Sequence, residues 1–291
     1  MSDTLIATLG GIAAMLGWGS SDWLAARSSK RYGTFETNLA VQSPGLLIMA
    51  LVLLFYHQTL PSWPVMSQIF LIGLMFTTAY LLMIKAFATG SVGIVAPLTN
   101  TFPLTTLILV IAFGNNVFSA LQILAMLLIV VGVIFLAYQK NVNNIPLKVL
   151  HKETFLALAS AVIWGTSFFI SDNVIRETSW QVIMATINST MVFFALLLIA
   201  WTARGKVIRS IKNVSKNKQG IASGVILTTG SITFYATAQK TGSVVIPAVI
   251  ASSSPLLASM LSAIYDKEQL SVLKRIGALI VVSGIIILNI V

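Results

Sequence analysis

Long apolar runs recur along this 291-residue chain and limit what it can fold into. Each run is about 20 residues long, which lets a helix cross a hydrocarbon core of roughly 30 Å. Apolar residues make up 57% of the chain and charged residues 9%, against roughly 25% charged in a soluble protein. This balance excludes a soluble enzyme, a disordered chain and a disulfide scaffold. We predict an all-α integral membrane protein with ten transmembrane helices, at residues 5–26, 38–57, 67–87, 93–113, 118–138, 154–174, 180–202, 220–239, 244–264 and 273–291.

Few residues of this chain could bind a metal or perform redox chemistry. Cysteine is absent, and the two histidines, His57 and His151, lie far apart at the ends of predicted spans. No group of side chains has the spacing of metal ligands, so we expect no metal site, no catalytic residue and no cofactor. The net charge of +10 would suggest nucleic-acid binding in a soluble protein. Here the basic residues lie in short loops, where they fix orientation in the membrane, so we expect no nucleic acid as partner.

The two halves of the chain repeat each other. The motif TGSV at residues 89–92 recurs 152 positions later at 241–244, and WGSS at 18–21 corresponds to WGTS at 164–167, 146 positions later. Matches in tryptophan and glycine at fixed spacing rarely arise by chance between apolar helices, so we infer a duplication. Each half then holds five spans. We predict a first five-helix repeat at 1–140, a cytoplasmic linker at 141–153 and a second repeat at 154–291.

The loop charges predict how the repeats are oriented. Because five is an odd number, two consecutive copies must enter the membrane from opposite sides. Of the 18 Lys and Arg residues, all but Arg176 and Lys240 lie in the loops after odd-numbered spans. The positive-inside rule places those loops in the cytoplasm and both termini outside. We therefore expect a multi-pass protein of the plasma membrane (the inner membrane of a bacterium), built from inverted repeats.

These features resemble the drug/metabolite transporter superfamily, in particular its EamA-type ten-helix members. The resemblance rests on the two five-span repeats, the WG[ST]S stretch that opens each half, and TGSV ahead of a proline-interrupted fourth span in each half. It implies a central cavity lined chiefly by spans 1, 3, 4, 6, 8 and 9, with spans 5 and 10 at the periphery. It also implies transport of small metabolites, most often the export of amino acids.

The fourth and ninth spans each carry two prolines and a polar cluster at mid-depth. Proline removes a backbone donor and frees a carbonyl about four residues earlier, and broken helices of this kind often contact the solute in transporters. A packing kink satisfied by neighbouring hydroxyls is the alternative. We expect hinges at Pro97, Pro103, Pro247 and Pro255. We expect cavity-lining side chains at Thr99, Asn100, Ser252 and Ser253.

The first and sixth spans carry matching stripes of residues. Trp18 and Asp22 share one face of the first span, with Ser21 beside them, because residues four apart in a helix are neighbours. Trp164, with Ser167 near it, takes the equivalent place on the sixth span. We expect these side chains to line the cavity. Close packing between helices would explain the same stripes.

Two ionisable residues within spans, Asp22 and Lys85, are candidates for solute binding because burying a charge in a membrane is costly. Both lie near the predicted cytoplasmic ends, so an ion pair or snorkelling of Lys85 explains them equally well. No acidic residue lies at the centre of a span, and the chain lacks the first-helix glutamate of the small multidrug exporters. This argues against a proton-driven exporter of cationic drugs and favours a facilitator, or a neutral or zwitterionic solute.

Polar residues on other spans complete the candidate site. We expect Tyr80 on the third span, and Tyr235 and Gln239 on the eighth, to line the cavity. Gln42 and its repeat partner Asn188 are further candidates. Interhelical hydrogen bonds would explain all five.

The sequence thus predicts a membrane transporter of small organic metabolites that works by alternating access, with export of amino acids or related compounds as the leading hypothesis. Uptake of sugars or nucleosides, or efflux of drugs, is the alternative within this class. A non-transporting membrane sensor or assembly protein is the alternative outside it. An enzyme is not expected, because the spans carry no nucleophile–base pair. The expected partners are a small-molecule solute and the lipid bilayer, with the protein a monomer or a homodimer.

Overall fold

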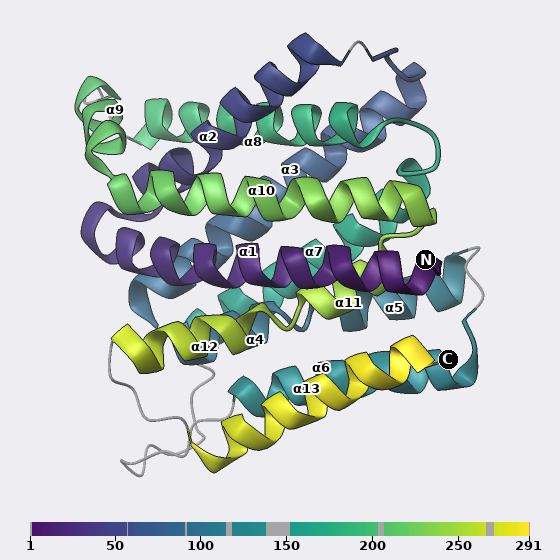
Figure 1. Ribbon diagram of the computed structural model, residues 1–291. Coiled ribbons are helices and arrows are strands. Elements are labelled where there is room, and N and C mark those ends of the chain that lie inside the picture. Colours follow the sequence, from purple (N-terminus) through teal and green to yellow (C-terminus); the bar gives the residue numbers. More distant parts are fainter. Residues whose placement is uncertain are drawn as a thin grey trace.

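The computed structural model shows helices packed side by side (Figure 1). It describes residues 2–56, 58–90, 92–114, 118–137, 152–202, 207–265 and 271–290, which leaves out His57, His151 and most of the predicted linker. The first half contains α1 (Asp3–Tyr32), α2 (Thr34–Phe55), α3 (Trp63–Thr89), α4 (Val92–Thr99), α5 (Phe102–Phe113) and α6 (Ala120–Ala137). The second half contains α7 (Lys152–Val174), α8 (Trp180–Thr202), α9 (Val207–Lys216), α10 (Lys218–Thr241), α11 (Val245–Ala251), α12 (Ser254–Tyr265) and α13 (Val272–Ile290).

Ten membrane crossings account for all of these helices except α9. Within the described ranges, nine stretches are long and apolar enough to cross a bilayer, with α4–α5 and α11–α12 each forming one crossing. The shorter apolar helix at Ala120–Leu136 supplies the tenth. The two ends of the chain lie at the same end of the bundle, as an even number of crossings requires (Figure 1). The predicted fold class, two inverted five-helix repeats in a membrane, is confirmed.

The fourth and ninth crossings break at mid-depth in the same way. The Asn100 amide donates to the Ala96 carbonyl at 3.0 Å, and at the equivalent position the Ser252 amide donates to Ala248 at 2.9 Å. After these bonds the helical ladder stops, and α5 and α12 begin two residues further on. The duplication therefore extends to the backbone hydrogen bonds at the two breaks.

Each break begins a new helix rather than a kink in a continuous one. Pro103 and Pro255 lie in the first turns of α5 and α12, where a missing amide hydrogen costs no helical bond. Pro97 and Pro247 lie inside the short helices α4 and α11. That the four prolines act as hinges remains a prediction.

Two glycines bring the halves together at these breaks. A methyl group on Gly19 of α1 would collide with the Ser254 carbonyl at the start of α12. A methyl group on Gly165 of α7 would collide with the Phe102 carbonyl at the start of α5. The glycine of the WG motif in each half thus allows its helix to pack closely against the break in the other half. These two contacts form part of the seam between the repeats, which also includes the packing of α1 against α10 and of α3 against α7.

Helices α6 and α13 pack against each other at one edge of the bundle (Figure 1), through close contacts at Gly132 and Gly277, as the resemblance implies. The loop between α8 and α10, which lies outside the ten predicted spans, contains the short helix α9. Its Val214 packs against a small apolar cluster formed by Leu39 and Val192, because one face of the helix is apolar. The sequence predicted no helix in this loop.

Candidate functional site

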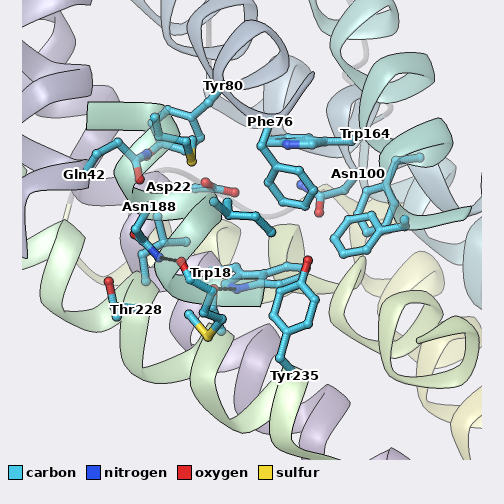
Figure 2. Close-up of a pocket in the computed structure, with 17 residues that line it drawn as sticks. Trp18, Asp22, Gln42, Phe76, Tyr80, Asn100, Trp164, Asn188, Thr228 and Tyr235 are labelled. Carbon is cyan, nitrogen blue, oxygen red and sulfur yellow. Dashed lines mark hydrogen bonds between the residues drawn. The ribbon is translucent and has the colours of Figure 1, made fainter. Parts of the chain in front are cut away.

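A cavity of about 90 Å³ lies between the two halves, with room for a few water molecules or a small organic group. Helices α1, α2 and α3 and the break between α4 and α5 line it from the first half, and α7, α8 and α10 from the second (Figure 2). Its lining residues are Trp18, Asp22, Gln42, Phe76, Tyr80, Asn100, Phe102, Trp164, Phe168, Met184, Ile187, Asn188, Met191, Leu227, Thr228, Ser231 and Tyr235.

Aromatic rings form much of the cavity wall. Phe168 stacks on Phe102 with their centroids 4.8 Å apart and meets Phe76 edge-on at 5.3 Å. The Trp18 indole nitrogen donates to the Ser231 hydroxyl at 3.0 Å, which fixes the ring between α1 and α10. The wall is therefore rigid and largely apolar. Aromatic groups with few polar atoms are typical of sites for small organic ligands.

Asp22 is the acidic member of this lining, which contains no basic side chain among the described residues. It is only 5% exposed, and the Asn100 side chain lies within hydrogen-bonding reach of it. Asn100 is itself held in place: its amide nitrogen donates to the Ala96 carbonyl at 2.8 Å, and its oxygen accepts from the Ser254 hydroxyl at 3.1 Å. The two broken crossings thus meet beside Asp22 and position the amide next to its carboxylate.

Four polar atoms of the lining are buried without a hydrogen bond to any described residue. They are Gln42 Nε2, Tyr80 Oη, Trp164 Nε1 and Tyr235 Oη. Tyr80 lies near the Ser21 and Ser223 hydroxyls and Tyr235 near that of Ser171, but neither contact has hydrogen-bond geometry. Buried polar groups in proteins are almost always paired, so unpaired ones grouped around one cavity point to a partner that enters it.

Six of the thirteen residues predicted to line the cavity do so: Trp18, Asp22, Tyr80, Asn100, Trp164 and Tyr235. Three others are buried hydroxyls that bond to carbonyls of their own helix turn: Thr99 to Val95, Ser167 to Ile163 and Ser252 to Val249. Ser21 bonds to Ser223 of α10 at 2.7 Å. Ser253 is buried outside the lining, and Lys85 is exposed and also outside it.

Gln239 belongs to a different structure, a set of hydrogen bonds that ties together the turns after α7 and α10. Its side chain accepts from the Trp180 amide at 3.1 Å and donates to the Thr178 carbonyl at 2.9 Å. We call this set, with the bonds of Asp172 and Arg176 described next, the end brace. It lies at the end of the bundle where α7 meets α8.

Asp172 is the centre of the end brace. One carboxylate oxygen accepts from the Ser243 hydroxyl at 2.6 Å and from the Val244 amide at 2.8 Å. The other oxygen pairs with Arg176 at 3.2 Å, and Arg176 in turn donates to the Gly242 carbonyl at 2.7 Å. Asp172 is therefore fully occupied by protein groups.

Spans 2 and 7, which correspond to α2 and α8, contribute lining residues. The resemblance implied that span 9, formed by α11 and α12, also lines the cavity, but it provides none of the lining residues. Gln42 and Asn188 had marked these two spans as further candidates. Thr228, Ser231 and Tyr235 follow the spacing i, i+3 and i+7 on α10, so this polar stripe could have been recognised from sequence. Three apolar residues of α8, such as Met184, carry no signal that distinguishes them from core residues.

In the described ranges, no three His, Asp or Glu side chains are grouped so that they could hold a metal ion.

Comparisons with known proteins agree with this architecture. The model of the EamA-like transporter family matches residues 5–138 and 151–290. One solved crystal structure is similar to 98% of this chain, over 96% of its own, with a TM-score of 0.70 and 18% sequence identity. At this identity the likeness shows the fold alone. No curated protein matches the chain.

Proposed function

Because the chain belongs to the EamA-like transporter family, we propose that it carries a small organic solute across the membrane through the cavity between its repeats. The observation that supports this most is the group of unpaired polar atoms around that cavity. Each such atom costs about 1–3 kcal/mol when it is buried without a partner. A polar solute would supply the missing hydrogen bonds.

The proposed mechanism is alternating access. The end brace closes one end of the bundle, and its bonds have no counterparts at the equivalent positions of the first half: Ala26 corresponds to Asp172, and Phe87 to Gln239. Breaking the brace would open that end while the other end closes. The breaks at Pro103 and Pro255, where the helical ladder is already interrupted, would serve as pivots.

The proposed orientation places the basic loops in the cytoplasm and both termini outside, in a bacterial inner membrane. It is supported by the distribution of Lys and Arg, which lie mostly in the loops after odd-numbered spans, for example Lys30 and Arg31 in the last turn of α1. The proposed repeats at 1–140 and 154–291 are then inverted, with a cytoplasmic linker between them. Labelling of the N-terminus in intact cells by an impermeant reagent would test the orientation.

The proposed solutes are amino acids and related amino compounds, and export is the proposed direction. A carboxylate, three amide side chains and two tyrosine hydroxyls in the lining suit a solute with both donors and acceptors. Sugar or nucleoside uptake and drug efflux are the other outcomes that the following test distinguishes.

The test is counterflow in proteoliposomes with labelled amino acids, amines, nucleosides and sugars. We expect one class to accumulate above empty vesicles. Asn100→Ala and Trp164→Ala should lower that flux by roughly tenfold or more, because each removes a group of the cavity wall. Thr229→Ala is the matched control, since Thr229 is exposed on the outer face of α10. Folded protein that moves no solute would contradict transport and favour a sensor or assembly protein.

A further inference from the structure

The cavity contains a buried acidic side chain without a basic partner among its lining residues. Asp22 is nearly buried, and none of the lining residues in the described chain is a lysine, arginine or histidine. The Asn100 amide beside it is a neutral donor, which solvates a carboxylate without cancelling its charge. A buried charge without a counter-charge is costly. A solute that carries one positive charge would make the occupied cavity neutral.

The wall around Asp22 suits the same kind of solute. Seven of the lining residues are aromatic, and Figure 2 shows Asp22 among the side chains of Trp18, Phe76 and Tyr80. Aromatic faces attract ammonium groups, and this attraction is strongest where water is excluded. The same rings would pack against the apolar body of an organic cation. The Asp22 carboxylate and the aromatic wall therefore both favour an organic cation. The carboxylate does so by neutralising its charge, and the aromatic rings do so by attracting its ammonium group.

An amino-acid zwitterion fits this cavity less well than an amine. Its ammonium group would pair with Asp22, but its carboxylate would meet only neutral donors such as Gln42 Nε2 and Trp164 Nε1. The occupied cavity would keep one net negative charge. An organic anion would place two negative charges in the same buried space.

We propose that the preferred solute is an organic monocation, a protonated amine on an aromatic or aliphatic body, whose ammonium group binds Asp22. This rests on the proposed function and identifies the solute class within it. It also reverses the expectation from sequence that a neutral or zwitterionic solute fits best, because the structure places Asp22 in the cavity wall.

Three probes that share a phenyl ring and differ in charge test the proposal: 2-phenylethylamine, phenylalanine and 3-phenylpropionate. Their binding to the purified full-length protein at neutral pH is measured by calorimetry. We expect the amine to bind roughly tenfold or more tightly than phenylalanine, and the anion to bind most weakly. Phenylalanine or the anion binding as tightly as the amine would overturn the proposal.

Asp22→Asn keeps the shape and removes the charge, and should weaken amine binding by roughly tenfold or more. Asp3→Asn, the same change at an exposed position of the same helix, should leave it unaltered. An unchanged amine affinity in Asp22→Asn would overturn the proposal, and if this variant does not fold, the ranking of the three probes decides alone. Counterflow measurements separate a failure of the proposed solute class from a failure of the proposed transport. Flux of a zwitterion or anion without flux of the amine overturns the solute class only, whereas no flux of any solute overturns transport.

Discussion

Asp22 of α1 and Asp172 of α7 lie on the corresponding first helices of the two repeats and are almost equally buried, at 5% and 3% exposure. Their surroundings differ. Asp172 accepts from Ser243 and Val244 and pairs with Arg176. Among the described residues, the Asn100 side chain is the hydrogen-bonding group beside Asp22, which faces the cavity. Burial alone therefore does not separate the two carboxylates, but the supply of protein partners does.

In our proposal, this difference explains how one fold combines a rigid end with a central cavity that binds a solute. A carboxylate whose oxygens are all paired within the protein holds two turns together, and a solute would have to displace those bonds to reach it. A carboxylate in a cavity that lacks a counter-charge is stabilised only when something enters. In our proposal, the same residue type on equivalent helices thus serves as a brace in one repeat and as a binding group in the other.

The largest effect on stability is expected when the brace is broken. Asp172→Asn removes the ion pair with Arg176 and weakens the two bonds to Ser243 and Val244, because hydrogen bonds to a charged group are stronger than neutral ones. We expect a loss of about 2 kcal/mol in unfolding free energy, seen as a lower unfolding temperature of the purified protein. An unfolding temperature equal to wild type would show that the brace does not hold the two turns.

The same substitution in the cavity should act in the opposite direction. Asp22→Asn replaces a buried charge that lacks a counter-charge with a neutral group of the same shape, so the empty protein should gain about 1 kcal/mol of stability. The measurement is again thermal unfolding, without solute. A loss of stability as large as that of Asp172→Asn would mean that Asp22 is also a structural group and would remove the contrast between the two aspartates.

Hydroxyl groups extend the comparison with smaller effects. Ser243→Ala removes a bond of the brace and should cost about 1 kcal/mol. Tyr235→Phe removes a hydroxyl without a hydrogen bond in the described chain, so stability should hardly change while solute affinity falls. Unfolding and binding measured on both variants check this. A Tyr235→Phe variant that loses stability yet binds normally would contradict the account.

The fold could be predicted because its signals are strong and local. Long apolar runs define the crossings, and the repeated WG and TGSV motifs reveal the duplication that the family match confirms. Helix α9 was missed because ten residues in a basic loop carry no span-length apolar signal. The two breaks were anticipated from their prolines, but their geometry was not. Pro103 and Pro255 begin helices rather than bend them, which depends on where the preceding helix stops.

The site could be predicted only in part, because sequence does not show where a hydroxyl finds its partner. Thr99, Ser167 and Ser252 looked like cavity residues, yet each hydroxyl bonds to a carbonyl of its own helix turn and needs no cavity. Larger polar residues at mid-span, such as Asn100 and Tyr235, reach beyond their own helix and do line the cavity. Apolar lining residues of α8 are indistinguishable from core positions without the tertiary structure.

The central claim, that the cavity between the repeats is the solute path, can be tested directly because the chain contains no cysteine. A single cysteine is placed at Thr228 in the cavity wall, or at its neighbour Thr229, which is exposed on the outer face of α10. Proteoliposomes are then treated with an impermeant thiol reagent from either side. We predict that Thr228→Cys reacts from both sides and that the transported solute protects it, while Thr229→Cys stays unreactive in lipid. Reaction from one side only, or no protection by solute, would contradict the account.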